Sequence, residues 1–212
     1  TAEDLAFLEG YAAHPTAEGR ERAERLCKVD PAVPWSILAI TFTNKAAGEL
    51  KERLERMLGP SANDIWASTF HSCCARILRR DIDKLGYATS FTIYDSADSE
   101  RVVKDAEKAL NIDEKAFPAK MVLGYISRAK DALKLAPAYM DECSKTGDYR
   151  MNRIASIYLE YEKRLKAANA LDFDDLILRT VLLLQQNEDV LSYYQKKFRY
   201  VLVDEYQDTN NM

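Results

Sequence analysis

Two adjacent carboxylates, Asp204 and Glu205, stand where an apolar run ends. The run, residues 200–203, has no polar alternation, so we expect a strand of a parallel sheet buried on both faces. Open α/β folds bind their ligands at the carboxyl ends of such strands. One carboxylate suits a hard cation, and a second can orient or deprotonate a water. The pair therefore suits a magnesium ion and an attacking water, as in phosphoryl transfer, although two acids can also simply end a surface strand.

Strands and helices alternate before this point, as a parallel sheet requires. Residues 36–41 form a short apolar run, and residues 44–58 follow with helical spacing until Gly59 and Pro60 stop them. The pattern repeats with a strand over 64–69 and a helix over 72–85, closed by Gly86. These two units predict neighbouring parallel strands.

Between residues 95 and 170 the strand signal disappears, and three amphipathic runs predict a helical subdomain. Another helix, over 173–185, precedes the last strand. Its first turn carries three acids, which resemble a metal cluster but also complement the helix dipole, and we favour the capping role for them: Asp172, Asp174 and Asp175. Tyr158 and Tyr161 lie on an apolar stripe and are predicted to be core residues.

The composition indicates a compact globular protein of 212 residues with a net charge of -4, which excludes disorder and a uniformly basic surface. No apolar stretch approaches the ~20 residues that span a bilayer, so no membrane partner is expected. Four cysteines form no C-x-x-C pair, which predicts reduced thiols and a cytoplasmic location. The basic residues of segment 120–134, Lys130 among them, are predicted to lie on solvated helix faces.

Three segments together resemble one known family. Residues 204–210 read DEYQDTN and resemble the second helicase motif of the superfamily 1 DNA helicases of the UvrD, PcrA and Rep type. Residues 37–47 resemble the first DNA-contacting motif of that family, and residues 68–72 resemble the next one, in matching order and spacing. Shorter likenesses at residues 91–95, 126–130 and 171–177 extend the resemblance over roughly 35–210.

The resemblance implies an α/β fold: a RecA-like P-loop NTPase parallel sheet with an inserted α-helical subdomain. Residues 1–94 and 171–212 would form the two parts of the motor domain, and residues 95–170 the insertion. The parent enzyme would be an ATP-dependent DNA helicase with 3′ to 5′ polarity, active in repair or replication. Its expected partners are single-stranded DNA, duplex junctions and a second RecA-like motor domain.

The same resemblance assigns roles to individual residues. Asp204 would hold Mg²⁺ and Glu205 would act on the attacking water beside ATP, while Gln207 would sense the nucleotide and couple it to DNA. Residues that follow two strand ends would contact DNA: Phe42, Thr43, Asn44, Lys45, Thr69, Phe70 and His71. There an aromatic face can stack on a base and polar groups can meet phosphates. Phe42 could equally be a core residue, and His71 a structural hydrogen-bonding residue.

The sequence also departs from the family. A phosphate loop G-x-x-x-x-G-K-[ST] requires a glycine followed by lysine, and none of the seven glycines is. Where the family carries this loop, residues 19–26 are a charged, helix-like run. The sequence stops at Met212, before the position of the second motor domain. We therefore expect this chain alone to be inactive, with no tightly bound nucleotide.

Two other functions stay open. A non-catalytic nucleic-acid or protein-binding module could keep the fold without hydrolysis, and the absent Gly-Lys pair favours this alternative. A helicase subunit of a helicase–nuclease complex would share these motifs, although Tyr206 and the short insertion are closer to the UvrD-like branch.

Overall fold

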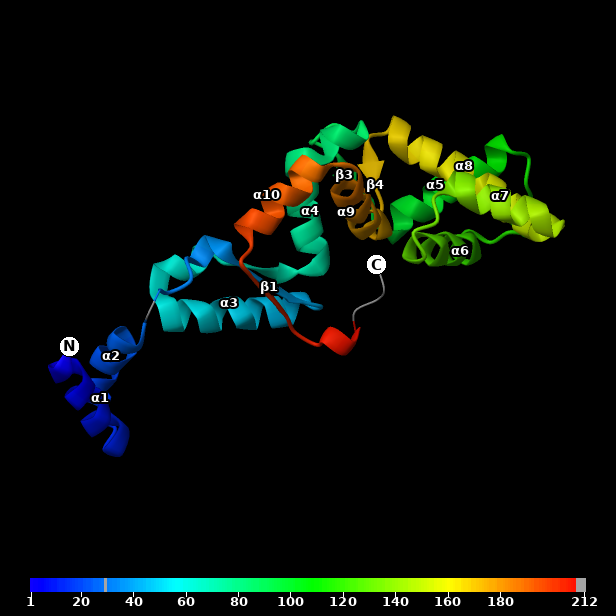
Figure 1. Ribbon diagram of the computed structural model, residues 1–212. Helices are drawn as coiled ribbons and strands as arrows, with labels where there is room; N and C mark the ends of the chain where they lie inside the picture. Colours follow the sequence, from blue (N-terminus) through cyan, green and yellow to red (C-terminus); the bar gives the residue numbers. More distant parts are fainter. Residues whose placement is uncertain (29, 209–212) are drawn as a thin grey trace.

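The computed structural model describes residues 1–28 and 30–208 and has a mixed α/β architecture with a parallel sheet (Figure 1). The sheet has the order β2-β1-β5 and consists of β1 (Ile37–Thr41), β2 (Trp66–Thr69) and β5 (Tyr200–Val203). Both pairings are parallel, with Thr41 opposite Thr69 and Ile40 opposite Val203. The three strands therefore end at the same edge of the sheet.

The helices that accompany this sheet are α3 (Asn44–Leu58), α4 (Phe70–Asp81), α9 (Phe173–Gln186) and α10 (Glu188–Lys197). The 3-10 turns are η1 (Pro34–Ser36), η2 (Gly59–Asp64), η3 (Ile82–Leu85) and η4 (Tyr206–Asp208). Helices α4 and α9 share a hydrophobic cluster with the sheet, in which Leu78 and Ile82 are fully buried and Trp66 nearly so. This cluster fixes where α4 and α9 begin relative to the strand ends.

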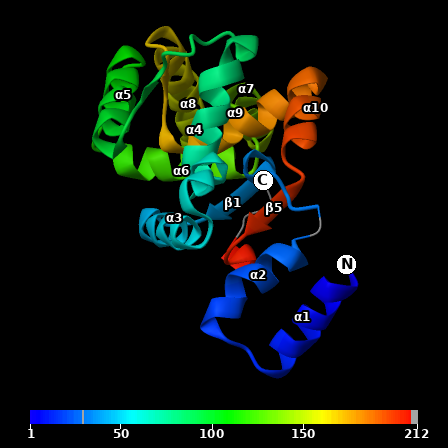
Figure 2. The ribbon, with the colours of Figure 1, turned by 90° about the vertical axis from the view of Figure 1, so that its left-hand side faces the viewer.

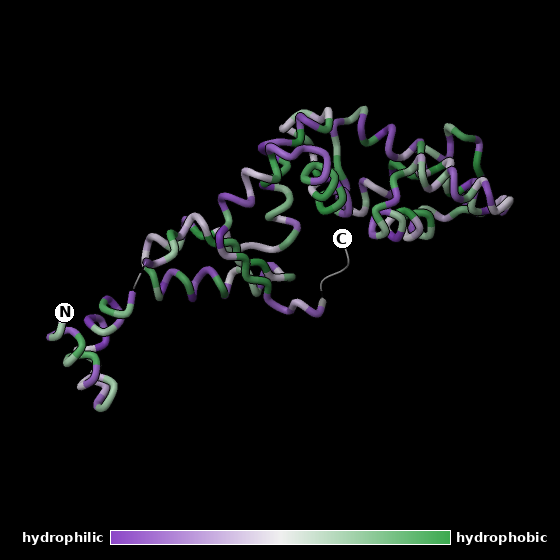
Figure 3. Tube along the Cα trace, viewed as in Figure 1, coloured by the Kyte–Doolittle hydropathy of each residue, from purple (hydrophilic) through white to green (hydrophobic). Residues whose placement is uncertain are grey.

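Local capping signals set the ends of these helices. The Thr43 hydroxyl accepts from the Ala46 N–H at the start of α3, and Gly59 ends the helix at φ 64°. Thr69 caps α4 in the same way, and Gly86, left-handed at φ 72°, follows η3. The predicted helices are confirmed here. Along α3 in Figure 3, hydrophilic (purple) and hydrophobic (green) residues recur from turn to turn, as expected of an amphipathic helix with one apolar side.

A second hydrophobic cluster belongs to the helices between the two parts of the sheet region. These are α5 (Ser96–Ala109), α6 (Ala119–Asp131), α7 (Ala136–Thr146) and α8 (Tyr149–Ala167). Tyr158 and Tyr161 are fully buried in it, as predicted. Where the chain enters and leaves these helices, β3 (Thr92–Ile93) and β4 (Ala170–Leu171) pair in parallel. Figure 2 shows this group of helices on one side of the sheet.

Helices α1 (Ala2–Ala13) and α2 (Ala17–Cys27) lie at the opposite end of the molecule in both views (Figures 1 and 2). They pack on each other, with the Arg22 guanidinium 4.3 Å from the Phe7 ring centroid. The charged run over residues 19–26 is therefore helical, as its composition suggested.

Two expectations are wrong. Strand β5 is not buried on both faces, since Val201 is 56% and Leu202 60% exposed. It is an edge strand with β1 on one side, so its side chains remain open to solvent within the described part of the chain. Lys130 is not on a solvated face, because its side chain is 0% exposed and meets carboxylates from two other helices.

Candidate functional site

The carboxyl edge of the sheet brings together residues that are far apart in sequence. The Asp204 N–H donates to the Ile40 carbonyl at 2.9 Å, which continues the ladder one residue past β5. Thr41 pairs with Thr69, so Phe42 and Phe70 leave their strands at the same level. The acidic motif and both segments predicted to contact DNA therefore share one edge of the sheet.

The acidic segment is exposed and locally ordered. The Glu205 N–H donates to Asp204 Oδ1 at 3.1 Å, and Glu205 adopts a left-handed φ of 52°. The Gln207 amide donates to Glu205 Oε2. Gln207 and Glu205, to which the family resemblance assigns separate roles toward the nucleotide, are thus in direct contact. Thr209 and Asn210 of the same motif lie outside the described residues.

Asp204 also lines a hollow of about 470 Å³ along one side of α3, together with Glu49, Arg53 and Arg56. Carboxylate oxygens in an open, solvated position fit magnesium, which binds through one or two carboxylates and keeps several waters. Within the described residues, no three His, Cys, Asp or Glu side chains gather into a metal site. Asp204 is thus a single-carboxylate candidate whose other ligands would come from water and phosphate.

Phe42 lies between the core and solvent. Its ring is 38% exposed and lies 5.1 Å from the Phe70 ring, tilted by 49°. Asn44 and Lys45 follow in the exposed first turn of α3, where Lys45 Nζ lies 3.9 Å from Glu49. The Phe42 ring edge, the Asn44 amide and the Lys45 ammonium are therefore open to solvent, whereas the Thr43 hydroxyl is already used as a helix cap.

In the second segment predicted to contact DNA, residues 69–71, one residue is a buried helix cap and another is partly exposed. Thr69 is buried, and its hydroxyl caps α4 by accepting from the Ser72 N–H. His71 is partly buried, and its ring stacks on Phe173 with centroids 3.8 Å apart. Burial lowers the pKa of His71, while the nearby Asp174 carboxylate acts in the opposite direction. Burial therefore favours the neutral imidazole of His71 over its charged form.

Phe173 lies beside His71 and was not among the residues that the sequence reasoning singled out. It is the first residue of α9, 56% exposed, and extends the aromatic surface of His71. The sequence offered one indication of its exposure: Phe173 lies between Asp172 and Asp174 at the start of a helix, where a core residue is not expected.

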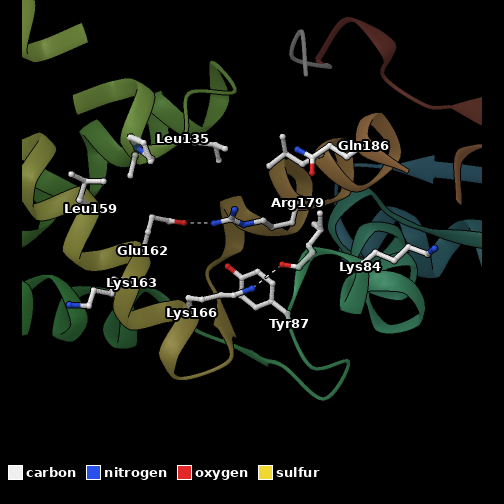
Figure 4. Close-up of a pocket in the computed structure, with 13 residues that line it drawn as sticks. Lys84, Tyr87, Leu135, Leu159, Glu162, Lys163, Lys166, Arg179 and Gln186 are labelled. Carbon is white, nitrogen blue, oxygen red and sulfur yellow. Dashed lines mark hydrogen bonds and ion pairs between the residues drawn. The ribbon is translucent and has the colours of Figure 1, made fainter. Parts of the chain in front are cut away.

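A second hollow, of about 580 Å³, lies at the far ends of η3 and α9 (Figure 4). The Arg179 guanidinium is paired with Glu162, and Lys166 donates to the Leu85 carbonyl at 2.9 Å. The charged groups that line this hollow link α8 to α9 and to η3, and the hollow lies away from the strand ends.

None of the described helices is long and apolar enough to cross a membrane.

A parallel sheet with paired acids and half-exposed aromatics at its carboxyl edge places this chain among the α/β domains, and open sheets of that class bind their ligands at this edge. Residues 20–212 match the model of the UvrD/REP helicase N-terminal domain family. The chain belongs to this family.

Individual relatives agree with this assignment. The chain is 47% identical over 207 residues to the ATP-dependent DNA helicase PcrA of Bacillus subtilis. It is 46% identical over 206 residues to the protein of that name from Staphylococcus aureus, and 44% identical to the one from Staphylococcus epidermidis. Each match covers 97% of this chain but only 28% of the relative's length.

Proposed function

We propose that this chain is the N-terminal motor-domain portion of an ATP-dependent DNA helicase that translocates 3′ to 5′ on single-stranded DNA. The observation that carries the proposal is the shared edge, where Asp204 continues the ladder beside β1 and the two aromatic segments leave neighbouring strands. Nucleotide chemistry and DNA contact would then lie on adjacent strands of one rigid sheet. In the whole protein, a second RecA-like domain and a DNA duplex junction would be the partners.

The proposed motor-domain function also implies a division of the chain into domains. Residues 1–94 and 171–212 would form a RecA-like motor domain, and residues 95–170 its helical insertion. Two separate hydrophobic clusters support this division, because each group of helices buries its own apolar face. The four free cysteines favour a reducing, cytoplasmic setting.

The residues of the edge would act as follows. Asp204 would hold magnesium, which supplies charge stabilisation to ATP phosphates, and Glu205 would orient the water. Gln207, which already contacts Glu205, would link the nucleotide to the DNA side. The DNA surface would comprise Phe42, Thr43, Asn44, Lys45, Thr69, Phe70 and His71, and Phe173 would extend it, because its ring stacks on His71. Thr69 would act there through its backbone position, because its hydroxyl caps α4.

Binding of a labelled single-stranded oligonucleotide, measured by fluorescence anisotropy at low and high salt, tests the DNA surface. We expect weak, salt-sensitive binding, because phosphate contacts release counterions. Phe42→Ala should weaken it by about 1–3 kcal/mol, the range for one stacked base. Met57→Ala, at an exposed apolar position near the other end of α3, is the matched control and should change nothing. Tight, salt-independent binding would contradict this assignment.

A second candidate, a non-catalytic binding module, is favoured by one observation. The sequence lacks a Gly-Lys pair, and residues Ala17–Cys27 form helix α2 where the family carries its phosphate loop. Without backbone amides to hold the phosphates, a nucleotide has no defined position, and misplacement by about 1 Å can cost roughly 100-fold in rate. We therefore expect no phosphate release with ATP, magnesium and single-stranded DNA. Turnover that disappears in Glu205→Gln would show that another segment holds the phosphates.

A further inference from the structure

Lys130 of α6 is a fully buried lysine held by three carboxylates. Its Nζ lies 2.7 Å from Asp172, 3.1 Å from Asp175 and 2.8 Å from Glu162. Burial alone would lower the pKa of Lys130, but these carboxylates raise it well above its ordinary value, so the ammonium is charged. One cation thereby ties α6 to α8, which carries Glu162, and to the first turn of α9.

The carboxylates are shared with a second cation. Arg179 of α9 pairs with Glu162, as the dashed line in Figure 4 shows, and its Nε lies 3.2 Å from Asp175. The cluster thus contains two cations and three carboxylates. A buried ion cluster contributes little net stability, because desolvation offsets the attraction, and its best-attested use is to specify one geometry.

Capping of α9 does not by itself require Lys130. Asp172 caps the helix by accepting from the Asp175 N–H at 2.8 Å. Helices α1 and α5 begin with the same kind of capping box, and there the capping hydrogen bonds are solvent-exposed. At α9 the remaining oxygen of Asp172 accepts from Lys130 and from the Tyr161 hydroxyl, at 2.7 and 2.8 Å. These extra contacts fix the start of α9 against the helices of the second cluster.

The residue after Asp172 is Phe173, whose exposed ring stacks on His71. We infer that Lys130 is a positioning residue for the nucleic-acid surface: through Asp172 and Asp175 it holds Phe173 against His71 as one continuous aromatic platform. The inference deepens the proposed function, on which its DNA-binding part rests. The stacking part concerns the chain alone and can be tested without DNA.

The chain offers a direct probe of the stack, because it has two histidines and the other, His14, is exposed. Proton NMR of the imidazole signals as a function of pH reports the pKa and ring environment of His71, with His14 as internal reference. Two influences act on the pKa of His71, namely burial and the Asp174 carboxylate. Every variant described below retains Asp174. The Phe173→Leu variant removes the ring that stacks on His71, so its spectrum shows the His71 signals without the stacking contact.

The decisive variant is Lys130→Met combined with Asp175→Asn, compared with Asp175→Asn alone. Above pH 7, where Asp175 is ionised, the double change removes one cation and one anion and the cluster keeps its net charge. The comparison with Asp175→Asn alone isolates the loss of Lys130 at lower pH, and Asn can still accept the capping bond. Lys120→Met makes the same substitution at an exposed position of the same helix and is the control. Lys130→Met alone is the harsher version, and the double variant serves if the single one does not fold.

We expect the His71 pKa to rise and its signals to move toward those of Phe173→Leu in the double variant, with Asp175→Asn and Lys120→Met unchanged. Affinity for single-stranded DNA should fall about 5- to 150-fold, the range for one lost base stack. His71 signals equal to those of Asp175→Asn would overturn the inference. So would unchanged affinity, provided that Phe173→Leu itself binds more weakly. If Phe173→Leu binds normally, the proposed DNA surface is refuted, and the His71 signals still decide the positioning role.

Discussion

The buried cluster around Lys130 makes a specific prediction about stability and pH. Three carboxylates face two cations in a cluster in which Lys130 and Asp175 are shielded from solvent, so one carboxylate has no full counter-charge. Burial raises the pKa of Asp175 from 3.8 to about 7, against the lowering effect of Lys130. The pKa of Asp172 is instead held below its ordinary value by Lys130, although burial opposes this. We therefore expect Asp175 to carry a proton in the folded protein at mildly acidic pH.

The sign follows from proton linkage. Between pH 4 and 7 the folded state holds a proton on Asp175 that the unfolded chain has released, so the free energy of unfolding falls as pH rises. Each pKa unit is worth about 1.4 kcal/mol, and the rise from 3.8 to about 7 therefore corresponds to about 4 kcal/mol. Asp175→Asn mimics the protonated acid at every pH. It should match the wild type near pH 4 and exceed it by up to about 4 kcal/mol above pH 7.

The measurement is urea unfolding of both proteins across pH 4 to 8, with the difference in free energy plotted against pH. Other groups also titrate in this range. Burial raises the pKa of Glu107 to about 7, and it lowers that of His71. Both groups are present in both proteins, so their contributions cancel in the difference. A difference that stays constant with pH, or grows toward acid, would refute the assignment of the proton to Asp175.

Three further outcomes are expected. Tyr161→Phe removes a hydroxyl that donates to the Asp172 carboxylate, and should lower the free energy of unfolding by about 1.5–3 kcal/mol in urea titrations; no loss would mean that the bond is replaced. Thr43→Ala removes the cap of α3 and should cost about 1 kcal/mol by the same assay, whereas Thr43→Ser should not. Burial raises the pKa of Cys73 to about 12, so iodoacetamide at pH 8 should modify the exposed Cys27 first, as mass spectrometry would show; equal rates would contradict this burial.

Much of the fold was predictable because its signals are local. The strand and helix units before residue 86 were recognised from apolar period, capping hydroxyls and terminal glycines, all within a few residues of each helix end. The capping role of Asp172 was likewise correct. Helices α1, α7 and α10 were not predicted. The motif residues of the candidate site were located from sequence, and the geometry of strand pairing then placed them on one edge.

The exposed state of β5 could not be read from its residues. A run of apolar side chains is typical of a doubly covered strand, and only the strand order shows that β5 lies at an edge. The contact between His71 and Phe173 is similar, because about one hundred residues separate the two rings and no periodic pattern links them.

The sequence by itself determined the element types, the family motifs and the residues at the strand ends, because each depends on neighbours along the chain. The tertiary structure decided which of those residues meet. Lys130 illustrates the limit: its helix predicts an amphipathic surface, but its charge is buried because carboxylates 32 to 45 residues later fold around it. Long-range packing sets the desolvation and the counter-charges that a buried ion experiences, and local sequence carries neither.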